Sequence, residues 1–124
     1  MYREFANGLY LEVGGTTGIA TEQNSCAEQL SGQSTVDLQV TVQTLTGATS
    51  PSLTVTLETS QDGVNWRLDT AATVTLTGTA GPLGPTLLYA TNPAVSASHV
   101  RLHYSLTGTG ATTMFSAGLG ISRN

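Results

Sequence analysis

The sequence predicts an all-β protein, an antiparallel β-sandwich of about 7–8 strands with jelly-roll or immunoglobulin-like topology. Apolar and polar residues alternate with a period of two in several segments, which recur about 10 to 15 residues apart between Gly-, Pro- and Ser-rich turns. β-Branched Thr and Val, which suit a pleated surface, are abundant. A chain of 124 residues fits a single domain, 1–124, with one core.

The N-terminal part of the chain has the least regular pattern. Two readings stay open for Met1 to Gly8: an N-terminal arm that docks on a neighbour, or a frayed terminus. We expect a short first strand at Leu9 to Val13 and another at Gly18 to Thr21. Glu22 to Gly32 is polar, and both a single helical turn and a loop fit it.

The clearest strands lie in the middle of the chain. From Thr35 to Gln43 apolar residues alternate with polar ones, which predicts a half-buried strand. Thr46 to Ser52 is a Gly-, Ser- and Pro-containing connection, and Leu53 to Glu58 repeats the alternation. Asp62-Gly63 then predicts a tight turn, because Gly accepts a positive φ without steric cost.

Trp66, the only Trp in the chain, follows that turn. It begins a returning strand, Asn65 to Ala71, in which Trp66 and Leu68 share one face. We expect Trp66 to close one end of the core, with its indole N–H bonded to a carbonyl.

The C-terminal half predicts four further strands, with Leu87 to Ala90 open to a reading as a bend. Residues 77–85 hold three Gly and two Pro and are expected to form a loop, and Thr91 to Pro93 is expected to form a turn. The predicted strands are Thr73 to Leu76, Leu87 to Ala90, His99 to Leu106 and Thr112 to Ser122.

One face of the last predicted strand carries small residues, Gly118 and Gly120. Small residues let another backbone or a flat partner approach closely, and they equally soften an edge strand. Together with two aromatic residues of the N-terminal segment they are the candidate partner-contact residues: Tyr2, Phe5, Gly118 and Gly120.

Composition excludes several classes of function. Only 10% of residues are charged, Lys is absent, and the net charge is −4, so no basic stripe for direct nucleic-acid binding exists. No apolar run is long enough for a transmembrane helix, and the N-terminus lacks the apolar core of a signal peptide, so we expect folding in the cytosol and no membrane contact. A Thr- and Ser-rich surface with few charges fits either a protein packed in an assembly or a polar, uncharged β-protein.

No group of residues predicts catalysis, a metal or a cofactor. His99 and His103 would lie about 13 Å apart on one strand face, too far to share a metal. Cys26 is single, so it forms no intrachain disulfide. Asp62, with Glu58 on the other side of the turn, admits a weak Ca²⁺ site, but Asp before Gly more often stabilises its own turn. We therefore expect no enzyme and no cofactor.

Three short motifs follow one another between Leu53 and Ile121: Ser60-Gln61-Asp62-Gly63-Val64-Asn65-Trp66, then His99-Val100-Arg101-Leu102-His103-Tyr104, then Thr113-Met114-Phe115-Ser116-Ala117-Gly118-Leu119. In this order and spacing they resemble small structural proteins of tailed bacteriophages. The resemblance implies a virion component: a capsid decoration protein, a minor head protein or a head–tail fitting. It also implies major capsid or other virion proteins as partners, a homo-oligomer, and location in the virion after folding in the host cytoplasm.

The first two of these motifs, the turn ending at Trp66 and the later strand with Val100-Arg101-Leu102, also resemble discoidin-type jelly rolls, which bind glycans or lipids through loops at one end. That resemblance implies a carbohydrate- or receptor-binding module. Such a module needs exposed aromatic rings, and the candidates here are Tyr2, Tyr10 and Tyr89.

Overall fold

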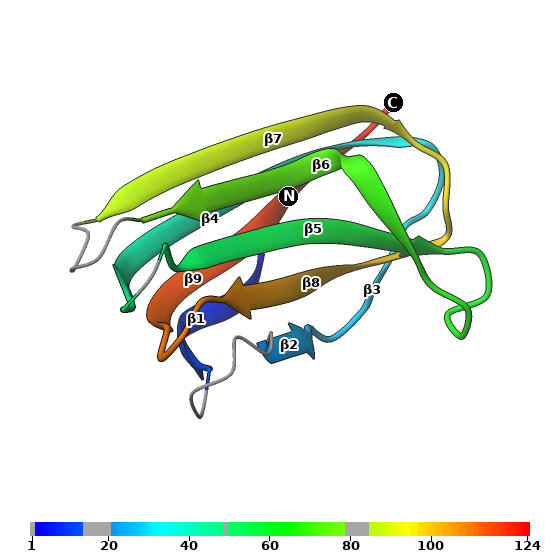
Figure 1. The fold of residues 1–124 in the computed structure, drawn as a ribbon. Helices are drawn as coiled ribbons and strands as arrows, with labels where there is room; N and C mark the ends of the chain where they lie inside the picture. The colour runs from blue at the N-terminus through cyan, green and yellow to red at the C-terminus, as the bar shows by residue number, and fades with distance from the viewer. Residues whose placement is uncertain (1, 14–20, 49, 79–84) are drawn as a thin grey trace.

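The protein is a two-layer sandwich of antiparallel strands (Figure 1). The computed structural model describes residues 2–13, 21–48, 50–78 and 85–124, and these form nine strands. The strands are β1 (Tyr2–Glu12), β2 (Thr21–Asn24), β3 (Glu28–Gln29), β4 (Ser34–Thr46), β5 (Ser52–Ser60), β6 (Arg67–Thr77), β7 (Thr86–Val95), β8 (His99–Thr107) and β9 (Thr112–Arg123).

The strand order is that of a jelly roll. One sheet runs β1-β9-β4-β7, and the other runs β2-β8-β5-β6 with β3 also paired to β8. Because β2 and β3 pair with successive parts of β8, they count as one interrupted strand. The eight resulting strands form two four-stranded sheets, the double-sheet arrangement of jelly rolls, so the predicted fold class is confirmed.

The core lies between the sheets and follows the predicted alternation. In β4 up to Val42, and throughout β8, every second residue is buried, including Val36, Leu38, Leu102 and Tyr104. Phe115 of β9 meets Tyr104 edge to face, with ring centroids 5.0 Å apart. The two sheets therefore interdigitate as the period-two pattern requires.

Trp66 does not close the core, and that expectation is wrong. In the pairing of β5 with β6, Thr56 faces Thr73 but Leu57 faces Asp69, so β6 carries three extra residues. An odd number of extra residues reverses which side chains face inward. Leu68 is therefore 53% exposed, and Trp66 lies half-buried in the loop before β6, outside the core.

Two segments expected to be turns or loops are instead paired as strands. Thr91 to Pro93 do not turn but continue β7, an edge strand, where Pro removes no needed hydrogen bond. Glu22 to Gly32 contain β2 and β3 and no helical turn. The described part of the expected arm, Tyr2 to Gly8, pairs with β9 within β1, and most of Gly18 to Thr21 lies outside the described residues. In the described chain no helix is long and apolar enough to cross a membrane.

Candidate functional site

The outer surface of the β1-β9-β4-β7 sheet, here called the four-stranded face, collects the exposed apolar side chains. On β7, outward residues alternate with Leu88 and Ala90, which pack against the core. Of the seven large apolar side chains that are exposed among the described residues, five lie on this face: Tyr2, Tyr10, Leu87, Tyr89 and Met114. The other two, Val64 and Leu68, belong to the second sheet and its loop.

Tyr2 and Tyr89 flank the middle of this face. Gln39 of β4 pairs with Gly118 on one side and with Tyr89 on the other. The Tyr2 ring lies over Gly118, so closely that a Cβ added at Gly118 would overlap the Tyr2 hydroxyl. Neighbouring strands are about 4.8 Å apart, so the two tyrosines sit about 10 Å apart on either side of the Gln39 amide.

The polar groups of the four-stranded face include three carboxylates, those of Glu4, Glu12 and Asp37, beside amide and hydroxyl groups. Gln39, Thr41 and Ser116 lie between the apolar side chains. The Asp37 carboxylate accepts a hydrogen bond of 2.6 Å from the Thr91 hydroxyl. The face is thus a sheet surface of apolar, hydroxyl and amide groups with carboxylates on β1 and β4, a composition suited to contact with another protein surface.

The structure brings together three of the four candidate partner-contact residues. Tyr2, Gly118 and Gly120 share the four-stranded face, whereas Phe5 is half-buried and packs against the core. Gly118 is buried under Tyr2 and the Arg3 carbonyl, so the close approach that a Gly permits is made by the chain's own β1. Gly120 remains partly accessible, with Asp37 as its nearest neighbour.

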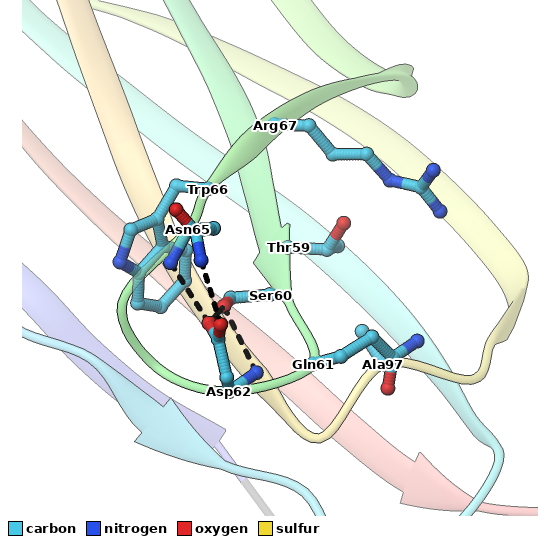
Figure 2. Close-up of a pocket in the computed structure, with 8 residues that line it drawn as sticks. All are labelled: Thr59, Ser60, Gln61, Asp62, Asn65, Trp66, Arg67 and Ala97. Atoms are coloured by element: carbon cyan, nitrogen blue, oxygen red, sulfur yellow. Dashed lines mark hydrogen bonds between the residues drawn. The ribbon is translucent and has the colours of Figure 1, made fainter.

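A second site, here called the end hollow, lies at the turn between β5 and β6 and has a volume of about 410 Å³. Its lining residues are Thr59, Ser60, Gln61, Asp62, Asn65, Trp66, Arg67 and Ala97 (Figure 2). None of them belongs to the other sheet, so the two sites are separate.

Asp62 organises the loop that forms this hollow (Figure 2). Its carboxylate accepts hydrogen bonds of 2.8 Å from the backbone N–H groups of Val64 and Asn65 and from the Asn65 amide, and one of 2.9 Å from Ser60 Oγ. These donors, led by the Asn65 N–H, hold the pKa of Asp62 well below its ordinary value. Gly63 has φ 76°, so the predicted turn is confirmed as an Asp-stabilised one.

Trp66 is fixed by a cation–π contact with β8. The Arg101 guanidinium carbon lies 4.3 Å from the Trp66 ring centroid, and Arg101 Nε donates to Glu58 Oε1 at 3.0 Å. Glu58 is buried, so the ion pair holds Arg101 in one position beneath the indole. Arg101 and Glu58 face each other across β5 and β8. From the sequence alone, only the outward position of each residue on its own strand could be predicted.

Neither His forms a catalytic or metal arrangement with the described residues. Ser98 Oγ lies 2.7 Å from His99 Nδ1, but it also lies 2.7 Å from the Gln61 carbonyl, to which it donates. The pair therefore ties the loop to β8. His103 bonds Glu22 at 2.9 Å and Asn24 at 2.8 Å on the outer face of the second sheet. Cys26 is exposed, and no three potential metal-ligating side chains gather in the described chain.

No protein-family model and no curated protein matches the chain. Its fold is similar to a chain of infectious bursal disease virus, Gx strain (TM-score 0.63, 12% identity), which covers 100% of this chain and 32% of the viral one. It is also similar to TmCBM61 in complex with β-1,4-galactotriose, with a TM-score of 0.51 and 16% identity over 94% of this chain and 70% of that one. A third similar structure is the CBM22-1 xylan-binding domain of Paenibacillus barcinonensis Xyn10C, with a TM-score of 0.52 and 12% identity over 100% of this chain and 94% of that one. At these identities the likeness establishes a jelly-roll fold.

Proposed function

We propose that the chain is a non-enzymatic structural protein of a tailed-phage virion, a capsid decoration or minor head protein that docks through the four-stranded face. A head–tail fitting would use the same face. The observation that carries the proposal is the gathering of five exposed apolar side chains on one side of one sheet. Single exposed apolar residues scattered over a surface are ordinary, whereas their concentration on one face of one sheet favours an interaction surface there.

The surface chemistry supports docking on protein. Burying large apolar side chains gains about 1.5–3 kcal/mol for each one fully removed from water, before the costs of association. The amide and hydroxyl groups between them can be paired at an interface, and the carboxylates of the face would accept hydrogen bonds from donors on the partner. A protein that binds the assembled particle and not its parts would stabilise that particle by a few kcal/mol per site at saturation.

Gradient-purified virions from cells that produce the protein provide the first test, and mass spectrometry should find the chain in the particle fraction. Particles that lack the chain are then mixed with the wild type, with Tyr89→Asp or with Leu68→Asp. Both positions are exposed, at 64% and 53%, but only Tyr89 is on the four-stranded face. We expect the wild type and Leu68→Asp to co-sediment with particles and Tyr89→Asp to stay in the supernatant.

Two results would overturn the proposal: absence of the chain from purified particles, or equal co-sedimentation of Tyr89→Asp and the wild type. Light scattering after size exclusion tests the expected homo-oligomer separately. A glycan array tests the other candidate function, a carbohydrate-binding module, which the end hollow favours.

A further inference from the structure

We propose that the end hollow binds an acidic sugar residue, a hexose ring that carries a carboxylate, and that Arg67 pairs with this carboxylate. This inference goes beyond the docking function and does not rest on the four-stranded face.

The size of the hollow fits a sugar better than a simple anion. Small-molecule sites span about 300–1,000 Å³. The hollow holds about 410 Å³, room for one or two sugar rings and far more than a carboxylate group fills.

Within the described chain, Arg67 is the one cation that lines the hollow, beside the carboxylate of Asp62. Among the described residues the Arg67 guanidinium makes no ion pair or hydrogen bond, unlike Arg3 and Arg101. The nearby acids are engaged: Asp62 accepts from its own loop, and Asp69 accepts from the Asn92 amide at 2.6 Å and from the Ala71 N–H at 3.1 Å. A free guanidinium fork is matched by the two oxygens of a carboxylate.

The remaining lining is amphipathic, as a sugar ring is. Ala97 and Trp66 supply apolar surface, while the Thr59 hydroxyl and the Gln61 amide supply polar groups. Figure 2 shows Arg67 and Trp66 leaving the loop on opposite sides, with Thr59 and Ser60 between them. A ligand that reaches both must extend across the loop, so an oligosaccharide fits better than one ring.

The site is held in shape before any ligand arrives. Asp62 fixes the loop from within, and the Ser98 hydroxyl bonds to the Gln61 carbonyl at 2.7 Å. Arg101 fixes the Trp66 ring from below. A preformed site loses little conformational entropy on binding.

Trp66 is the only Trp of the chain, so its fluorescence reports on the site. The probes are a trisaccharide of galacturonic acid, the matching trisaccharide of galactose, and an acetylated Glu dipeptide, with calorimetry as a second readout. We expect the acidic trisaccharide to bind at least about tenfold more tightly than either of the others. Arg67→Gln should weaken binding of the acidic trisaccharide by at least about tenfold and leave binding of the neutral one unchanged. Arg123→Gln, at an exposed Arg of the other sheet, is the matched control and should change neither.

The proposal is overturned if neither readout detects binding of the acidic trisaccharide at concentrations up to about 10 mM, where the binding free energy would be weaker than about −3 kcal/mol. It is also overturned if Arg67→Gln binds as the wild type does, or if both Arg variants lose affinity equally. Binding of the Glu dipeptide as tightly as the acidic sugar would assign the hollow to a protein carboxylate and refute the sugar. Loss of particle binding by Tyr89→Asp has no bearing on these results.

Discussion

A single methyl group added at Gly118 should destabilise the protein, whereas the same addition at Gly120 should not. A Cβ at Gly118 would overlap the Tyr2 hydroxyl and lie 2.8 Å from the Arg3 carbonyl oxygen. The side chain can swing away, but the carbonyl belongs to the paired backbone of β1. At Gly120 the nearest atom is Asp37 Cβ at 3.5 Å, an ordinary contact.

The two substitutions should therefore change stability with opposite signs. Overpacking costs about 1–3 kcal/mol, and near 124 residues each kcal/mol shifts the melting temperature by about 4 °C. Gly118→Ala should thus lower the melting temperature by about 4–12 °C. Gly120→Ala should leave it unchanged or raise it slightly, because Ala narrows the unfolded ensemble by about 0.4–1 kcal/mol.

Thermal unfolding followed by far-ultraviolet circular dichroism measures both shifts of the melting temperature. The double variant Tyr2→Ala with Gly118→Ala adds a check on the cause, because removing the ring relieves one of the two overlaps. We expect it to be more stable than the sum of the single effects predicts. Equal stability of Gly118→Ala and Gly120→Ala would show that β1 is not held against β9 as the structure has it.

Two further predictions concern buried and loop positions. The Tyr104 hydroxyl is buried and makes no hydrogen bond of good geometry with the described residues, and the nearby Ser25 hydroxyl is already bonded to Cys26 O and Leu102 N, so Tyr104→Phe should be neutral or stabilise the fold by about 1 kcal/mol in urea unfolding. Burial raises the pKa of Tyr104 to about 12, above its value of 10.0 in an unfolded chain, so stability present below pH 10 should be lost as pH rises toward 12. Tyr104→Phe should lose less over that range, and an identical alkaline loss would contradict this. Asp62→Ala removes the acceptor of four loop hydrogen bonds and should speed proteolytic cleavage of residues 61–66, while Asp69→Ala, outside that loop, should not.

The alternation of apolar and polar residues predicted most accurately the inner strands, which pair with a neighbouring strand on each edge. β8 and β9 follow their predicted spans closely, because each is paired on both edges and directs its apolar side chains alternately into the core. Pro93 and Trp66 were misread for the opposite reason. Pro93 suggested a turn, but it lies in an edge strand, which tolerates Pro. Trp66 faces away from the core because the pairing of β5 with β6 contains an irregularity that local sequence does not predict.

Which residues meet in the candidate sites depends on the order of the strands in each sheet. The alternation of apolar and polar residues does not predict that order. Tyr89 alternates outward beside Leu87 in the sequence, so its exposure could be predicted. Its place across Gln39 from Tyr2 follows only from the order β1-β9-β4-β7, in which residues 2 and 89 flank the two inner strands. The Asp62 turn was readable because its hydrogen bonds span only three residues.

The four-stranded face and the end hollow should act independently, because they belong to different sheets and share no lining residue. Effects of substitutions more than about 7–10 Å apart with no common partner usually add within about 0.5 kcal/mol. Tyr89→Asp should therefore leave the affinity for the acidic trisaccharide unchanged, and Arg67→Gln should leave particle binding unchanged. The double variant should show both single losses with no extra one. If Arg67→Gln bound particles less tightly than the wild type, the end hollow would contact the particle, and Arg67 would belong to the docking surface.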